Sequence, residues 1–275
     1  MPISLRSTSP RPLIMGIVNL TSDSFSDGGR LMDADVAEAH ARLLVEQGAD
    51  ILDLGAESTR PGAQPVSSDQ ELARLLPLIE RLADVTIPIS VDTRNPGTMR
   101  AVIDAGIDMI NDVNALQAPG ALDVVADSTV SVCLMHMKGD PLNMQAAPVY
   151  QSVVSEVASF LEIRCDAARQ AGISNERMLV DPGIGFGKNL NHNLELLRAC
   201  GAIGRQCGVP VLVGASRKSM LGELTGQPVH ERLAASIAVA LAAANCGAAV
   251  LRVHDVRATR DALSVWLAVT GHSTN

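Results

Sequence analysis

The chain has 275 residues, of which 47% are hydrophobic and 2% aromatic, and its 22 basic and 30 acidic residues give a formal net charge of −8. This length suits one α/β barrel whose core is filled by aliphatic side chains. The acidic balance and the scarcity of aromatic rings argue against nucleic-acid or anionic-membrane binding as the main task, although a local basic cluster could still hold an anionic substrate.

Eight short apolar runs recur along the chain, and most of them stop at a polar or charged residue. The runs are Leu13–Val18, Asp50–Leu54, Ile87–Val91, Asp108–Ile110, Val130–Met135, Met178–Val180, Pro210–Val213 and Ala248–Leu251. A helix-length segment follows each run, and several of these segments end at a glycine, the residue that most often follows a helix. This alternation predicts a (β/α)₈ barrel, an α/β fold with its active site at the C-terminal ends of the strands.

Helix signals lie between these runs. Ala34–Gln47 has helical apolar spacing, and Ser68–Ala83 begins with serine cap candidates and acidic residues. Asn95-Pro96 places proline at a first helical position. Leu233–Ala244 is apolar except for one serine and is too short to span a membrane, so we expect a buried core helix there.

No linker or charge block divides the chain, so we expect residues 1–275 to form a single domain, with residues 1–12 as a flexible N-terminal arm. The arm is polar and contains no apolar segment of the signal-peptide kind. The five cysteines form no C-x-x-C pair, which favours reduced thiols. We therefore expect a cytoplasmic protein with no membrane segment.

Three longer connections follow the first, second and fifth apolar runs, at Thr21–Met32, Ser58–Ser68 and Lys138–Val149. Long loops at a barrel mouth commonly act as substrate loops or lids. A plain solvated connection is the alternative, and it is strongest for Lys138–Val149.

Asp92, Asn111 and Asp181 each follow a predicted strand. Carboxylates accept hydrogen bonds from ring N–H and exocyclic amine groups, and an asparagine side chain both donates and accepts. Three such groups at one mouth favour a site for an amino-pyrimidine-like edge. A single aspartate in such a place is often only a helix cap.

The segment Asp181–Lys188 reads DPGIGFGK and matches neither the dinucleotide fingerprint nor the phosphate-loop pattern. It combines an acid at a strand end with a glycine-rich loop that lets a flat ligand approach the backbone. The alternative is a glycine-rich turn with a structural aspartate.

Basic side chains follow the last two predicted strands, in Ser216–Ser219 and in Arg252–Asp255. This sector of a barrel often holds phosphate. Arg252 and His254 lie two positions apart on an extended segment, so they face the same side and predict an anion clamp. Alternatively, Arg252 pairs with a strand-end aspartate inside the barrel.

Asn19 opens an oxygen-rich segment that runs to Gly29. Mg²⁺ prefers oxygen ligands and often binds through one protein group together with substrate phosphates. We expect Asn19 to hold Mg²⁺; a polar surface loop without a metal is the alternative.

Together these motifs resemble the bacterial dihydropteroate synthases of the pterin-binding family, from about Leu13 to Val269. The matching segments are Met15–Gly29, Glu57–Gly62, Ser90–Thr93, Ile110–Asp112, Leu134–Met137, Asp181–Lys188, Ser216–Ser219 and Arg252–Asp255. The resemblance implies a transferase of folate biosynthesis. Such an enzyme joins para-aminobenzoate to 6-hydroxymethyl-7,8-dihydropterin pyrophosphate and releases 7,8-dihydropteroate and pyrophosphate.

The resemblance also implies a role for each site residue. The pterin site would contain Asp92, Asn111, Asp181, Lys218 and Arg252, of which all but Asn111 are implied to be catalytic. The pyrophosphate site would contain Asn19, Thr59, Arg252 and His254, with Asn19 also holding Mg²⁺. The aminobenzoate site, which would also bind sulfonamides, would contain Thr59, Pro61, Phe186 and Ser219. Asp23 and Arg60 would serve loop closure.

The resemblance further implies a homodimer. Ser22 and Ala215 depart from residues that are frequent in the family, and neither departure removes a ligand. Two alternatives stay open: a folate-dependent methyltransferase of the same fold, and a non-catalytic pterin-binding protein. Release of pyrophosphate on turnover separates the synthase from the methyltransferase. Loss of Lys218, Arg252 or Asn19 would indicate the non-catalytic protein, and all three are present.

Overall fold

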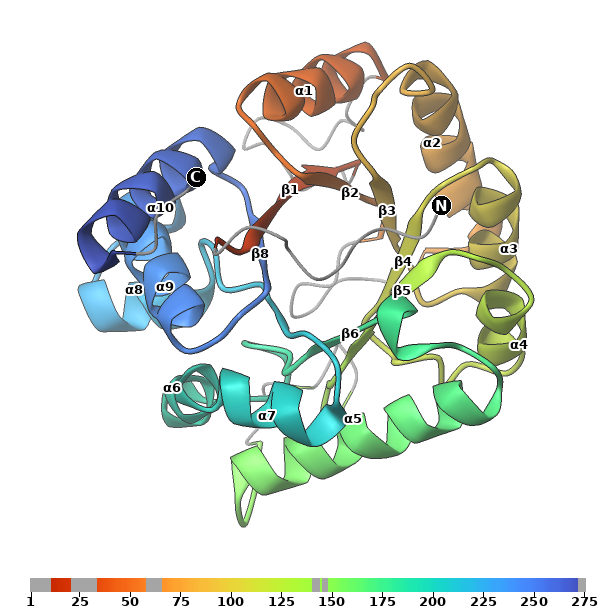
Figure 1. The fold of residues 1–275 in the computed structure, drawn as a ribbon. Coiled ribbons are helices and arrows are strands. Elements are labelled where there is room, and N and C mark those ends of the chain that lie inside the picture. Colours follow the sequence, from red (N-terminus) through yellow and green to blue (C-terminus); the bar gives the residue numbers. More distant parts are fainter. Residues whose placement is uncertain (1–10, 21–33, 58–65, 140–143, 145–147, 272–275) are drawn as a thin grey trace.

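The computed structural model describes residues 11–20, 34–57, 66–139, 144 and 148–271, and these form a parallel barrel surrounded by helices (Figure 1). The strands are β1 (Leu13–Asn19), β2 (Ile51–Gly55), β3 (Ile89–Asp92), β4 (Met109–Asp112), β5 (Ser131–Met135), β6 (Met178–Asp181), β7 (Leu212–Val213) and β8 (Val250–Val253). Their order is β6-β5-β4-β3-β2-β1-β8-β7. Val180 bridges Val211, and its N–H donates to Pro210 O at 3.0 Å, which closes the ring. The predicted (β/α)₈ barrel is confirmed.

Helices cover the outside of the barrel in Figure 1. They are α1 (Ala34–Glu46), α2 (Ser68–Arg81), α3 (Pro96–Asp104), α4 (Ala121–Ala126), α5 (Val153–Gln170), α6 (Leu190–Arg198), α7 (Cys200–Cys207), α8 (Ser219–Thr225), α9 (Leu233–Asn245) and α10 (Val256–Thr270), with 3₁₀ turns η1 (Asn175–Arg177) and η2 (Val229–Glu231). A predicted serine cap is present at Ser67, whose side chain accepts from Gln70 N, and Pro96 begins α3 as predicted, with Asn95 before it accepting from Gly97 N. Two helices, and not one, follow both β6 and β7.

The barrel interior has an apolar layer beneath a polar one. One cluster of buried side chains consists of Met15, Ile51, Met109, Cys133, Leu179, Leu212 and Val250, one from each of seven strands. Side chains two positions apart on a strand face the same side. The next inward residues are therefore Asp53, Asn111, Asp181 and Arg252, which places a polar layer towards the C-terminal ends of the strands.

One sequence expectation is wrong. Helix α9 was expected to be a buried core helix, but only Ser236, Ala240 and Ala243 on it are buried, and Leu233 is 47% exposed. An outer helix of a barrel meets the strands along one face only, so an all-round apolar composition leaves apolar side chains at the surface.

Of the predicted arm, residues 1–10 lie outside the described residues, while Arg11 forms two hydrogen bonds, of 2.6 and 2.7 Å, with the carboxylate of Asp50. These contacts tie the chain to the barrel just ahead of β1. The five cysteines are all free thiols, in agreement with the expectation from their spacing. No helix in the described part of the chain is long and apolar enough to cross a membrane.

Candidate active site

Four strand-end residues lie in register across neighbouring strands. Asn19 pairs with Gly55 between β1 and β2, Gly55 with Asp92 between β2 and β3, and Asp92 with Asn111 between β3 and β4. A Cβ built on Gly55 would lie 3.5 Å from Asn19 Oδ1 and 3.7 Å from Asp92 Cβ. The glycine therefore brings Asn19 and Asp92 to the same small space at the barrel mouth.

Arg252 lies at the centre of the polar layer, between two carboxylates. Its Nε donates to Asp53 Oδ2 at 2.6 Å and its Nη2 donates to Asp92 Oδ2 at 3.0 Å. Arg252 therefore does pair with a strand-end aspartate inside the barrel, as the alternative from the sequence expected. The pairing fixes the plane of the guanidinium at the mouth, where a flat ring could stack on it.

Asp53 is a site residue that the sequence analysis missed. It lies within β2, its side chain is fully buried, and its Oδ2 also accepts from Asn111 Nδ2 at 3.3 Å. Its Oδ1 is buried without a hydrogen-bond partner. A charged residue inside an apolar parallel strand was the available signal, because such strands are normally apolar throughout.

Burial and mutual repulsion perturb the ionisable groups of this layer. Burial, with neighbouring carboxylates, raises the pKa of Asp92 to about 7 against the opposing charge of Arg252. Burial also raises the pKa of Asp181, which the charge of Lys218 opposes. Burial lowers the pKa of Lys218 to about 8. Such shifts, from several charges in one concave place, are typical of a functional site.

The glycine-rich loop after β6 brings Lys218 and Phe186 together. Lys218 Nζ donates to Ile184 O and lies 4.3 Å from the centroid of the Phe186 ring. Gly183, Gly185 and Gly187 have φ of 68°, 82° and 64°, values that residues other than glycine rarely adopt. The loop thus forms one wall of the mouth, with a cation lying against an aromatic face.

Contacts between the loops after β7 and β8 hold His254, one of the two residues predicted to form an anion clamp. Arg217 donates to Asp255 with both Nε (3.0 Å) and Nη2 (2.5 Å), and it has a φ of 58°. Ser216 Oγ accepts from His254 N at 3.3 Å and lies 3.1 Å from His254 Nδ1. A serine hydroxyl that donates to Nδ1 leaves the ring proton on Nε2, where an anion could receive it.

A Mg²⁺ site can be tested against the donors present. The described residues contain no group of three His, Cys, Asp or Glu side chains that could hold a metal. The donor at the mouth that fits is the amide oxygen of Asn19, beside the space at Gly55. One neutral oxygen suits Mg²⁺ only if substrate oxygens and water complete the shell.

The structure brings together most of the predicted site residues at one mouth. These are Asn19, Asp92, Asn111, Asp181, Phe186, Lys218, Ser219, Arg252 and His254, all at or just beyond strand ends. Asp23, Thr59, Arg60 and Pro61 lie outside the described residues.

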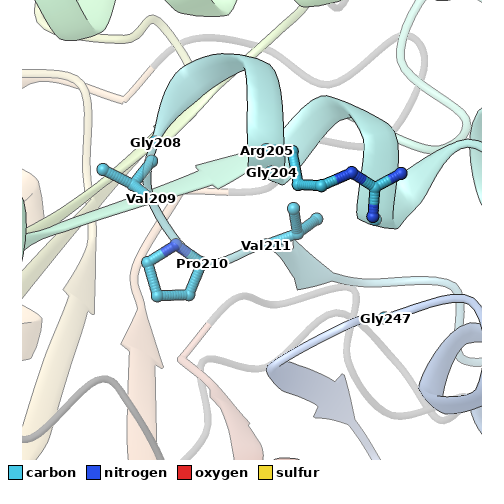
Figure 2. A pocket seen from close by; sticks show the side chains of 8 residues that line it. Gly204, Arg205, Gly208, Val209, Pro210, Val211 and Gly247 are labelled. Carbon is cyan, nitrogen blue, oxygen red and sulfur yellow. The ribbon is translucent and has the colours of Figure 1, made fainter.

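A surface groove of about 460 Å³ lies at the other end of the barrel (Figure 2). Its lining includes Gly204, Gly208, Val211 and Gly247, which precede or begin β7 and β8. Apart from Arg205, no ionisable side chain lines it. The groove therefore has no part in the polar layer at the mouth.

Comparison with known proteins identifies the arrangement. Residues 15–254 match the family described as "Pterin binding enzyme". The chain is 50% identical over 263 residues to a dihydropteroate synthase of Neisseria meningitidis serogroup C, covering 94% of this chain and 93% of that one.

Solved structures agree. The Yersinia pestis dihydropteroate synthase with a sulfonamide drug has a TM-score of 0.90 at 43% identity, covering 95% of both chains. The Xanthomonas albilineans enzyme with 4-aminobenzoic acid has a TM-score of 0.86 at 54% identity, covering 94% of this chain and 93% of that one.

Proposed function

The chain belongs to the pterin-binding enzyme family and, within it, to the dihydropteroate synthases, and we propose that its barrel mouth joins para-aminobenzoate to 6-hydroxymethyl-7,8-dihydropterin pyrophosphate. The products are 7,8-dihydropteroate and pyrophosphate. The observation that carries the proposal is the buried Asp53–Arg252–Asp92 group at the C-terminal ends of the strands, with which the charge of Lys218 interacts.

Asp92, Asn111 and Asp181 hold the pterin edge. Their carboxylate and amide oxygens can accept from ring N–H and amine groups, as the register of β3 and β4 allows. Lys218 supplies a donor from the opposite wall, and Arg252 covers one ring face. The carboxylates also favour positive charge on the pterin and its methylene carbon.

The leaving group lies towards Asn19, Arg252 and His254. Arg252 and His254 donate charge-assisted hydrogen bonds to the pyrophosphate as the carbon–oxygen bond breaks and its electron pair passes to oxygen. When bound, Mg²⁺ supplies further neutralisation of this leaving group, and Asn19 is the described residue that would hold it.

The aminobenzoate lies beside Phe186 and Ser219, next to Lys218. Its neutral amine attacks the methylene carbon, a carbon–nitrogen bond forms, and the ammonium releases a proton to solvent. Positioning is the main contribution of the protein to this step. No covalent enzyme intermediate is required. Thr59 and Pro61 are proposed for the same subsite and Thr59 also for the pyrophosphate, with Asp23 and Arg60 in loop closure.

One assay tests the proposal. Purified protein is incubated with both substrates, with and without Mg²⁺, and dihydropteroate and pyrophosphate are quantified. We expect equal amounts of the two products, and none without aminobenzoate. Methyl transfer in a parallel incubation with a methyl-folate donor, with no pyrophosphate released in the first, would favour the methyltransferase alternative, and tight pterin binding without turnover would favour the non-catalytic one.

We also propose a homodimer formed through the α8–α9 side of the barrel. Leu224, Val229 and Leu233 are 53%, 52% and 47% exposed there, and α9 buries only one side of its apolar surface. Grouped exposed apolar side chains are typical of interaction surfaces. Sedimentation of the wild type and of Leu233→Glu tests this: a monomeric wild type, or an unaltered dimer in the variant, would contradict it.

A further inference from the structure

A buried lysine behind the glycine-rich loop has no part in the mechanism above. Lys188 is 2% exposed, and its Nζ lies 2.9 Å from Phe186 O, 3.0 Å from His136 Nδ1 and 3.3 Å from His136 O. An ammonium group has three donors and no acceptor, so these three acceptors satisfy it. We propose that Lys188, through its contacts with Phe186 O and His136, is a positioning residue for the aminobenzoate half of the site.

His136 connects Lys188 to the strand ends. The backbone N–H of His136 donates to the backbone oxygen of Asp181 at 3.0 Å, and this bond joins the end of β5 to the end of β6. Burial lowers the pKa of Lys188 to about 7; when Lys188 is protonated, its ammonium can only donate, so His136 Nδ1 accepts and the neutral ring carries its proton on Nε2. Burial and the charge of Lys188 lower the pKa of His136 to about 3, in agreement with a neutral ring.

The loop fits tightly against the segment after β5. A Cβ at Gly183 would lie 1.9 Å from His136 O, and one at Gly187 would lie 2.2 Å from Lys138 O. Tyr150 OH also donates to Gly187 O at 2.9 Å. These contacts fix both ends of the loop, and Lys188 holds its middle at the Phe186 carbonyl.

The middle of the loop is the part that faces the reaction. The Phe186 ring lies against Lys218 Nζ, and the neighbouring Ile184 carbonyl accepts from the same ammonium. A displaced Phe186 carbonyl therefore shifts both the ring and the cation beside it. The hydrogen bonds of Lys188 in the described structure go to His136 and Phe186. None of them goes to β3 or β4, the strands that carry Asp92 and Asn111.

The inference rests on the proposed function, and a pair of methionine variants tests it. Lys188→Met removes the three donors, while Arg42→Met is a control that removes a cation bonded to Glu38 and Asp84 on the outside of the barrel, away from the loop. In Lys188→Met we expect the KM for aminobenzoate and the Ki of a sulfonamide to rise together, by roughly tenfold or more. The Kd of the pterin alcohol should change by no more than about twofold, and Arg42→Met should match the wild type.

An unchanged aminobenzoate KM in a folded Lys188→Met protein, or equal losses for both substrates, overturns the inference alone. A wild-type protein that makes no dihydropteroate overturns the proposed function and the inference with it. If Lys188→Met does not fold, as circular dichroism would reveal, a second pair decides. His136→Asn keeps an acceptor near the Nδ1 position and should retain most of the aminobenzoate affinity, whereas His136→Leu should lose it. Equal behaviour of these two variants would also overturn the inference.

Discussion

Asp53→Asn tests whether the buried carboxylate of β2 holds Arg252 in place. The variant keeps the shape of the side chain and removes its charge. An amide oxygen at the Oδ2 position can still accept from Arg252 Nε, which lies 2.6 Å from Asp53 Oδ2. The amide NH₂ then occupies the position of Oδ1, which has no hydrogen-bond partner in the buried interior.

The magnitude follows from these two changes. Replacing a charge-assisted hydrogen bond with a neutral one costs about 1 kcal/mol, and burying an unpaired amide donor costs about 1–3 kcal/mol. We therefore expect the free energy of unfolding to fall by roughly 2–4 kcal/mol. Among the described residues, Asp92 is then the remaining carboxylate hydrogen-bonded to Arg252, and the kcat/KM for the pterin substrate should fall by about tenfold or more.

Urea unfolding followed by circular dichroism gives the first quantity, and steady-state kinetics the second. Asp84→Asn is the matched control, because Asp84 forms a two-bond pair with Arg42 at the surface. Exposed pairs contribute little to stability, so its urea midpoint should match the wild type. If Asp53→Asn unfolds at the wild-type midpoint with unaltered kinetics, Asp53 does not position Arg252.

Three further outcomes are expected. Lys218→Ala should nearly abolish turnover with an unchanged circular dichroism spectrum, since Lys218 lies on a mouth loop; normal pterin affinity and turnover would contradict its assignment. His254→Ala should weaken the pterin pyrophosphate far more than the pterin alcohol in calorimetry, by about 1.5–3 kcal/mol, and equal losses for the two ligands would be contrary evidence. The kcat/KM for the pterin substrate should fall below about pH 7, because Asp92 takes up a proton and loses acceptor capacity. It should fall again above about pH 8, because Lys218 loses its charge. Asp92→Asn should abolish the decrease on the acid side.

The sequence predicted the features that depend on local pattern. Alternating apolar runs and helices indicated the barrel, because parallel strands with helical connections read this way regardless of their partners. The caps at Ser67 and Asn95 depend on residues two or three positions away and were predictable for the same reason. The strand-end groups Asp92, Asn111 and Asp181 followed from the rule that parallel strands end on one face.

Features that depend on distant partners were not predictable. The charge of Asp53 within an apolar run could have indicated a site residue, but nothing in that run indicates its partner Arg252, 199 positions away. Lys188 was noted in its motif, yet its role depends on His136, 52 residues earlier. For helix α9 the sequence led to a wrong expectation, because its apolar composition indicates full burial, whereas the barrel contacts only one face of the helix.

The polar layer also explains how an acidic protein can bind an anionic substrate. Three carboxylates, from Asp53, Asp92 and Asp181, lie around two cations, Arg252 and Lys218. Burial disfavours the charged forms of these groups, as the raised pKa of Asp92 and the lowered pKa of Lys218 show. A pterin that donates to the carboxylates and a pyrophosphate that accepts from the cations stabilise both sets of charges at once. The site is therefore organised for a ligand that donates hydrogen bonds at one end and is anionic at the other, and neither half of that ligand alone would complete it.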